Sequence, residues 1–226
     1  RNKIIENGEA LQKYPWMSQK GQSIGQHYGL VALGLFKSQE EIDSAPKHIG
    51  TVQIGDIRYK DMNEDGVIDE YDECPIGYSN IPRIQFGLTA GFSYKGFDFS
   101  MLWQGAAQFS VYFSNGAVWE FRDGGNAFEH HLGRFNPEDP STWDKATYPR
   151  LHDGNFPNNH RKSTYWLKKG DYLRLKNVEI GYSLPKHLFS KIGVSKLRFF
   201  VSGTNLLTFD HQNTFDPETE NERAYN

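Results

Sequence analysis

The chain has no long apolar run. No part of its 226 residues approaches the roughly 18 consecutive apolar residues that a membrane-spanning helix needs. Its mean hydropathy is −0.68. A low average does not exclude a membrane protein built from strands, because barrel strands alternate apolar with polar residues and cross the bilayer in about ten residues. The sequence therefore excludes a spanning helix within these residues and leaves a membrane barrel open.

Cysteine and excess basic charge are also lacking. The single cysteine, Cys74, excludes an internal disulfide and a zinc cluster made of cysteines. The net charge is −3 and no basic stripe carries interleaved aromatic residues, so nucleic acid is not an expected partner. The chain starts at Arg1 without an initiator methionine, a signal peptide or a lipidation motif, and we expect it to be an internal piece of a longer protein.

No catalytic arrangement is evident. The histidines of the long polar segment lack zinc-site spacing such as His-Glu-x-x-His, and we interpret them as loop residues. They are His130, His131, His152 and His160. Ser114, His152 and Asp153 supply the residue types of a hydrolytic triad, but no serine lies in a nucleophile elbow. We therefore predict that the protein is not an enzyme.

Alternation of apolar and polar residues is the strongest pattern present. It covers residues 83–104 as two strands joined at Lys95 and Gly96. One face carries Phe86, Leu88, Ala90, Phe92, Tyr94, Phe97, Phe99, Met101 and Trp103, and the other carries Gln85, Gly87, Thr89, Gly91, Ser93, Asp98, Ser100 and Gln104. Successive side chains of a strand point to opposite faces. Small and hydroxyl residues opposite bulky apolar ones favour a polar interior behind an apolar exterior, which is typical of an outer-membrane barrel.

Two further strands are predicted near the end of the chain. Residues 172–182 alternate with a phase slip near Asn177, which indicates a β-bulge. Residues 197–205 form another predicted strand, with Leu197, Phe199 and Val201 on one face. Short turns at residues 95–96 and 186–193 separate strands, whereas residues 54–84 and 109–163 read as long loops. We expect about five or six antiparallel strands, with a helical turn or two in the acidic residues 39–43.

Residues 61–72 match the pattern of a twelve-residue calcium loop. The predicted ligands are Asp61, Asn63, Asp65, the Val67 carbonyl, Asp69 and Asp72. Aspartate replaces the usual glutamate at the last position, and no amphipathic helix precedes the loop. The alternative is a solvated turn in which Asp and Asn side chains bond their own backbone without metal. We expect structural Ca²⁺, because five oxygen-bearing side chains held together without a cation would repel one another.

The tryptophans suggest two roles. Trp119 and Trp143 lie inside the long polar segment, where contact with a ligand or another protein competes with local packing. Trp103, Tyr165 and Trp166 lie near predicted strand ends, and we expect them in an aromatic girdle at a membrane interface.

Taken together, a series of motifs resembles the C-terminal part of the SusC/RagA-type TonB-dependent transporters. In order, the motifs are GDIRYKDMNEDGVID (residues 55–69), Pro82, Gly87, YKGFD (94–98), QG (104–105), GDYLRLKNV (170–178), GYSLP (181–185), SGTNLLTF (202–209) and DPE (216–218). They cover nearly the whole chain. The family's closing strand, its plug domain and most of its barrel have no counterpart in residues 1–226, so the resemblance predicts a fragment of a larger protein.

The resemblance implies an all-β fold: the C-terminal strands of a 22-stranded antiparallel transmembrane barrel with long extracellular loops. Such proteins lie in the outer membrane of Bacteroidetes-like Gram-negative bacteria, in contact with its lipid. They import oligosaccharides or peptides, take energy from the TonB complex through the plug, and work beneath a SusD-like surface lipoprotein. The resemblance places residues 54–84 and 109–163 outside the cell and both short turns at the periplasmic side.

A secreted, calcium-stabilised β-sandwich that binds carbohydrate is the alternative interpretation. It would account for the calcium-like loop and the tryptophans. It predicts that the bulky rows of the sheet pack against a second sheet, whereas the transporter predicts that they face lipid.

Overall fold

The computed structural model describes residues 3–6, 8, 11–114, 116, 118–188, 193–211 and 216–218. The chain divides into two compact units, a sheet unit and a loop unit. The sheet unit comprises Pro82–Gln108 and Gly170–Asn213, and the loop unit comprises Arg1–Ile81, Phe109–Lys169 and Thr214–Asn226. Among the described residues, no helix has both the length and the apolar character needed to cross a membrane.

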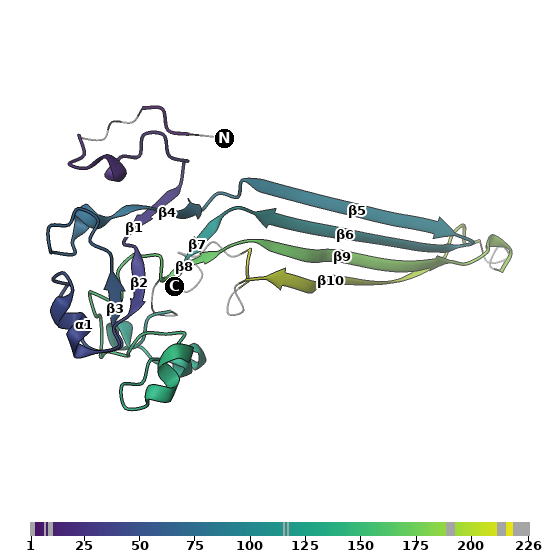
Figure 1. Cartoon of the computed structure of the whole chain (residues 1–226). Coiled ribbons are helices and arrows are strands. Elements are labelled where there is room, and N and C mark those ends of the chain that lie inside the picture. The colour runs from purple at the N-terminus through teal and green to yellow at the C-terminus, as the bar shows by residue number, and fades with distance from the viewer. Residues whose placement is uncertain are drawn as a thin grey trace. The chain divides into compact units, whose positions relative to one another are not determined.

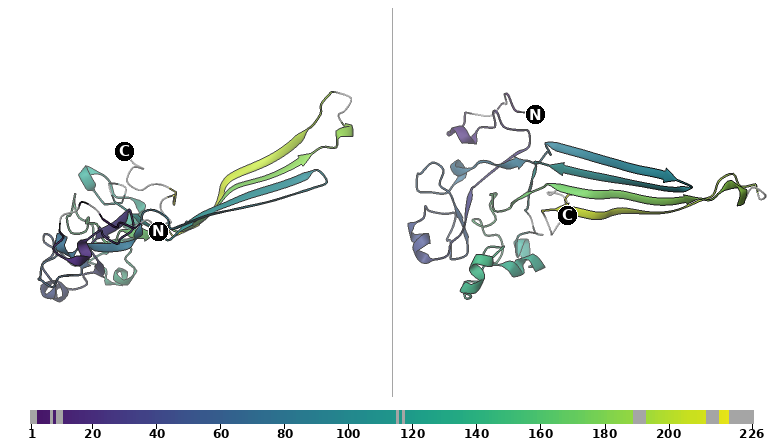
Figure 2. Two further views of the ribbon diagram at one scale, coloured as in Figure 1. Left: turned by 90° about the horizontal axis from the view of Figure 1, so that it is seen from above. Right: turned by 45° about the vertical axis from the view of Figure 1, so that its right-hand side comes forward.

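The sheet unit is one antiparallel sheet of long strands. Its members are β5 (Ile84–Tyr94), β6 (Phe97–Ala107), β9 (Tyr172–Ser183) and β10 (Arg198–Asp210). They lie side by side in the order β10-β9-β6-β5 (Figures 1 and 2). The sequence predicted five or six strands and ended the last at residue 205, so the described sheet has fewer strands and β10 is longer than expected. A short helix, η6 (Lys186–Leu188), follows β9, and the rest of the turn predicted at residues 186–193 lies largely outside the described residues.

The hairpin between β5 and β6 closes as predicted. Lys95 and Gly96 both have positive φ, at 44° and 87°, which is the conformation of a two-residue type I′ turn. A Cβ on Gly96 would lie 2.7 Å from the carbonyl oxygen of Ser183. Glycine is therefore required there by both backbone conformation and space.

The predicted bulge in β9 is confirmed. Asn177 pairs with Leu102 of β6 and Leu175 pairs with Trp103, so Lys176 is an extra residue with no residue opposite it in β6. A register shift occurs at the same level between β9 and β10. The extra residue resets the alternation, which returns both halves of β9 to the same pair of faces.

The loop unit contains short paired strands rather than plain loops. β1 (Gln26–Gly29) pairs with β4 (Cys74–Ser79), β2 (Ala32–Leu35) with β3 (Ile57–Tyr59), and β7 (Ser110–Tyr112) with β8 (Leu167–Lys169). The helices are η1 (Pro15–Met17), α1 (Gln39–Ser44), η2 (Glu70–Asp72), η3 (Arg122–Gly124), η4 (Glu129–Gly133) and η5 (Pro140–Lys145). The predicted helical turn in the acidic stretch is α1, which begins at an N-cap where Ser38 accepts the backbone N–H of Glu41.

Residues 54–81 and 109–163, most of the two predicted long loops, lie in the loop unit and contain some of its short strands and helices; their extracellular position stays a prediction. These segments share a core with the first fifty residues, in which Leu30, Phe36, Ile57, Tyr59, Phe135 and Trp166 are almost completely buried. The pairing that joins them is non-local, as in β1 with β4 and β7 with β8. Local turn chemistry rich in Asn, Gly and Pro carries no information about such pairing, because it depends on residues far along the chain.

Candidate functional site

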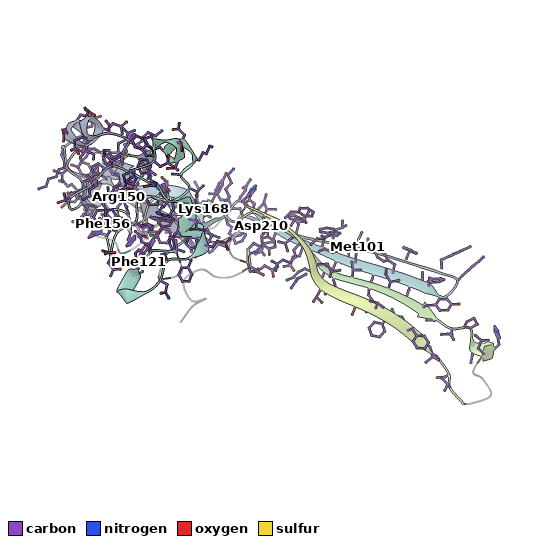
Figure 3. All side chains as sticks on the ribbon, turned by 90° about the horizontal axis from the view of Figure 1, so that it is seen from below. Met101, Phe121, Arg150, Phe156, Lys168 and Asp210 are labelled. Carbon is purple, nitrogen blue, oxygen red and sulfur yellow. The ribbon has the colours of Figure 1, made fainter. Side chains whose placement is uncertain are left out.

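The two faces of the long sheet differ in chemistry along all four strands. Residues directly opposite one another in an antiparallel pair share a face. One face, the apolar face, carries Ile84, Phe86, Leu88, Phe92, Tyr94, Phe97, Phe99, Met101, Trp103, Leu173, Leu175, Val178, Ile180, Tyr182, Phe199, Val201, Leu207 and Phe209. The side chains stand off both sides of the strands in Figure 3, where Met101 is labelled. The alternation predicted for one hairpin thus extends across the whole described sheet.

Most of the apolar face is uncovered within the described part of the sheet unit, although Leu175 is buried. Val201 is 77% exposed, Phe92 63% and Leu88 58%. A contiguous apolar surface of this kind on a water-soluble monomer would be unusual, and such surfaces mark contact with a membrane or with another protein. The aromatic rings touch along the face, as between Phe97 and Tyr182, whose centroids lie 4.5 Å apart.

The opposite face, the polar face, carries short polar and charged side chains. They are Gln85, Thr89, Ser93, Asp98, Ser100, Gln104, Tyr172, Arg174, Asn177, Glu179, Ser183, Arg198, Ser202, Thr204, Thr208 and Asp210, with Leu102, Ala106 and Phe200 as apolar exceptions. Arg198 of β10 bonds Asp98 of β6 and Glu179 of β9, so one guanidinium links three strands. Gly181 makes this possible, because a Cβ there would overlap the guanidinium. Three charged side chains of this face therefore form one hydrogen-bonded network.

The calcium-like loop is held by hydrogen bonds to its own backbone. Asp61 accepts the N–H groups of Glu64 and Gly66 at 2.7 and 2.8 Å, and Asp65 accepts that of Val67 at 3.0 Å. The two carboxylate oxygens of Asp72, which is completely buried, accept the N–H groups of Met62 and Asp69 at 2.7 and 2.9 Å. Asp72 thus links the start of the loop, through the Met62 N–H, to its end, through the Asp69 N–H.

These bonds define a complete self-capped loop. The Asn63 amide donates to the Asp65 carboxylate at 2.9 Å and to the Tyr14 hydroxyl at 3.3 Å, while its oxygen accepts the Asp65 N–H at 3.1 Å. Asp69 caps η2 by accepting the Tyr71 N–H at 2.8 Å. In the part of the chain that the structure describes, no three His, Cys, Asp or Glu side chains converge as a metal site would require. Ca²⁺ binding by this loop stays a prediction.

The predicted binding tryptophans have packing roles in the structure. Trp119 is 9% exposed, stacks on His160 with centroids 4.9 Å apart, and lies beneath the Arg122 guanidinium. Trp143 stacks on the buried Phe135 at 5.0 Å and donates its indole N–H to the Asn136 carbonyl at 2.8 Å. Ligand contact by either ring stays a prediction.

The girdle role expected for Trp166 was wrong. This residue is 4% exposed within the loop unit and donates its indole N–H to the Asn159 carbonyl at 2.6 Å. Tyr165, its neighbour in the chain, also belongs to the loop unit, and burial raises its pKa above the usual range. Trp103 alone of the three lies on the apolar face of the long sheet, where it stacks on Phe209 at 6.4 Å.

A buried acidic network organises the loop unit and was not predicted. Glu120 is completely buried, and its carboxylate accepts the Tyr148 hydroxyl at 2.6 Å, the His160 ring N–H at 3.0 Å and the His152 backbone N–H at 3.0 Å. Burial opposes its charge, but the bonds from His160 and Tyr148 outweigh burial and lower the pKa of Glu120. Burial and the nearby Glu120 charge raise the pKa of Tyr148.

Glu120 also anchors a strained piece of backbone. Phe121 and Asp123 have φ values of 45° and 54°, in the left-handed region that residues other than glycine rarely adopt. Such conformations cost about 1–3 kcal/mol each and persist only when surrounding bonds hold them. The three bonds to Glu120 supply that restraint on one side, and the Asn155 amide bonds the Asp123 carboxylate at 3.1 Å on the other.

A second buried carboxylate continues the network. Asp56 is completely buried and bonds the His152 ring at 2.6 Å, the Asn159 amide at 2.9 Å and the Gln53 backbone N–H at 2.7 Å. His152 therefore joins both acids, since its ring contacts Asp56 and its backbone N–H contacts Glu120. The sequence held no signal for this pairing, because Asp56 lies nearly one hundred residues from its partners.

Neither carboxylate network shows a catalytic arrangement. Both acids are fully enclosed, and every bond described for them reaches a group that orders the backbone or another buried side chain. A catalytic acid or base must reach a substrate directly or through one water molecule. We therefore assign the networks to holding the loop unit together, and we place the candidate functional surface on the two-faced sheet.

Comparison with known proteins identifies relatives of one kind. The TonB-dependent receptor P26 of Formosa agariphila is 32% identical over 202 residues, covering 89% of this chain and 20% of the receptor. The TonB-dependent receptor P3 of the same organism is 26% identical over 212 residues, covering 93% of this chain and 20% of that receptor. No family model matches the chain.

Solved structures agree in fold. The RagAB peptide importer in its open-open state has a TM-score of 0.61 at 22% identity, covering 87% of this chain and 20% of that chain. In the closed-closed state the TM-score is 0.57 at 22% identity, covering 85% and 20%. The chain thus spans about one fifth of the length of these proteins. They are named as receptors and an importer, not as enzymes, in agreement with the prediction that the protein is not an enzyme. Over the part that it spans, the chain is thus similar in sequence to TonB-dependent receptors and similar in fold to the RagAB structures.

Proposed function

We propose that the chain is part of an outer-membrane importer and that its long sheet is a section of the barrel wall. The observation that carries this proposal is the uncovered apolar face backed by a polar face across four strands of 11 to 13 residues. Strands of about ten residues with this alternation suit a bilayer, with bulky side chains toward lipid and small polar ones toward an aqueous lumen. The complete protein then forms the closed, 22-stranded barrel implied by the resemblance.

The finer assignment is also a proposal. We infer import of oligosaccharides or peptides, a SusD-like surface lipoprotein as partner, and energy from the TonB complex through a plug domain. Support comes from the relatives, which are named as TonB-dependent receptors, and from the fold neighbours, which are named as a peptide importer. The loop unit is proposed to lie on the extracellular side, because long connections of bacterial barrels are extracellular and short turns periplasmic.

Spin labels on adjacent residues provide a direct test of the wall. In the complete protein in lipid vesicles, we expect a label at Phe92→Cys to collide with membrane-soluble oxygen and a label at Ser93→Cys to collide with a water-soluble relaxation agent. The two positions are consecutive in β5 and lie on opposite faces. The unsubstituted protein is the blank, because its Cys74 is buried. Equal access of the aqueous agent to both labels would contradict the proposal.

The alternative, a secreted carbohydrate-binding sandwich, requires a second sheet over the apolar face. The described residues of the sheet unit form a single layer. The importer is therefore the better-supported proposal, and a protein that stays in aqueous solution without detergent would reverse that preference.

We also propose that residues 61–72 take up structural Ca²⁺. The side-chain oxygens that accept backbone N–H groups keep further lone pairs, so capping and metal ligation are compatible. Calorimetric titration is expected to detect one site with a Kd of about 10⁻⁴ to 10⁻³ M, as in extracellular calcium modules. Asp61→Asn keeps an acceptor but removes a charge and should weaken binding, whereas Asp139→Asn, at the N-cap of η5, should not. Absence of binding at 10 mM Ca²⁺, about ten times the weaker Kd, would leave the self-capped loop as the complete description.

A further inference from the structure

Two buried histidines of the loop unit each accept a backbone hydrogen bond through a ring nitrogen. The Tyr59 N–H donates to Nε2 of His48 at 3.0 Å, and the Phe128 N–H donates to Nδ1 of His131 at 2.7 Å. A backbone N–H is always a donor, so the ring nitrogen that receives it carries no proton. Each ring is therefore neutral, and its tautomer follows from the heavy-atom positions alone.

The second nitrogen of each ring donates to a carbonyl. Nδ1 of His48 bonds the Pro46 oxygen at 2.7 Å, and Nε2 of His131 bonds the Val118 oxygen at 2.9 Å. His48 thus ties the segment after α1 to β3, and His131 ties the start of η4 to the residue before Trp119. Each histidine therefore links two backbone segments through its two ring nitrogens. Protonation of the accepting nitrogen would place its new N–H against the N–H of Tyr59 or Phe128.

The surroundings of both rings are apolar on balance. His48 is 5% exposed and packs against Phe36 and Tyr59; Arg58 and Asp56 are the charged groups near it, and they act in opposite directions on its protonation. His131 is 2% exposed and packs against Tyr148 and His130, with Glu120 the nearby acid. His130 disfavours a second positive charge and Glu120 favours one. Burial is the largest influence at both sites and lowers the pKa of each histidine below the usual 6.5.

We propose that His48 and His131 form an acid-released latch, so that mildly acidic conditions open the backbone at Tyr59 and Phe128 while the long sheet keeps its structure. A histidine whose pKa is lower in the folded state binds its proton preferentially when the segment is open. The stabilisation is therefore complete well above pH 6.5 and decreases as the pH falls through 6.5 toward the lowered folded value. The latch is a property of the loop unit and does not rest on the importer proposal.

Hydrogen exchange at the two latched amides tests the latch in the complete protein in detergent. Between pH 8 and 5, after correction for intrinsic exchange, we expect protection of the Tyr59 and Phe128 amides to fall below pH 6.5 by up to about tenfold per pH unit. Protection in the centre of β9 should not change over this range. Protection at Tyr59 and Phe128 that does not vary with pH would overturn the proposal.

Replacements that do not titrate distinguish the contributions of His48 and His131. His131→Asn places a side-chain oxygen where it can accept the Phe128 N–H without taking up a proton, so the pH dependence should disappear at Phe128 and remain at Tyr59. His48→Gln should produce the reverse pattern. His187→Asn, in η6 of the sheet unit, is the matched control and should change neither. Retention of the full pH dependence at both amides in the double variant would also overturn the latch, and the wild-type measurement decides the matter if a variant does not fold.

Discussion

Glu120→Ala is expected to destabilise the loop unit by about 3–5 kcal/mol, the largest effect of any single substitution considered for this unit. The change leaves the Tyr148 hydroxyl, the His160 ring N–H and the His152 backbone N–H without their acceptor in a buried site. It also releases the restraint on the left-handed Phe121 and Asp123. Urea unfolding followed by tryptophan fluorescence measures the effect, because Trp119 stacks on His160 beside the carboxylate.

Two further variants serve as references for the cost of Glu120→Ala. Glu120→Gln keeps the shape and one acceptor oxygen but sets an NH₂ group against donors, so its cost is expected to be smaller, about 1–3 kcal/mol. Asp144→Ala removes an exposed carboxylate that bonds Lys37 at 2.6 Å, and it should leave the free energy of unfolding almost unchanged because water screens this pair. If Glu120→Ala cost no more than Asp144→Ala, the buried network would not be what holds the loop unit together.

Leu88→Lys is expected to destabilise the membrane-inserted protein by about 2–4 kcal/mol, whereas Thr89→Lys should be close to neutral. The two residues are neighbours in the middle of β5, and both are exposed in the described sheet. Only the first would bring a charge into hydrocarbon, because Leu88 lies on the apolar face and Thr89 on the polar face. Reversible urea unfolding from lipid vesicles measures both free energies under the same conditions.

This pair of lysine variants separates the two functional interpretations. If the sheet were surrounded by water, both substitutions would be exposed surface changes and each should fall within about 0.5 kcal/mol. Equal costs at the two positions would therefore count against a barrel wall. A large cost at Leu88 alone would support lipid contact at the apolar face, independently of any assay of transport.

Local pattern was sufficient to assign the two faces of β5, β6 and β9. A strand that separates two different environments must alternate in chemistry, so the face of each residue can be read from its position. The same reasoning located the turn at Lys95 and Gly96 and a bulge near Asn177, which the structure places at Lys176, since each changes the phase of the alternation in the sequence. The calcium-like spacing of residues 61–72 predicted converging ligands, and that convergence stays a prediction; the structure adds that Asp72 accepts the Met62 N–H near the start of the loop.

The loop unit shows what the sequence by itself could not determine. Its acids Asp56 and Glu120 look like any loop carboxylates in the sequence, and Trp166 was misassigned to a membrane interface. The environments of the two acids arise from contacts between segments about 30 to 100 residues apart. Such contacts produce no periodic pattern in the sequence. The sequence by itself determined which side chains share a face of the sheet, because strand geometry is local. Only the tertiary structure decided which polar groups are buried together, because burial depends on the whole surrounding fold.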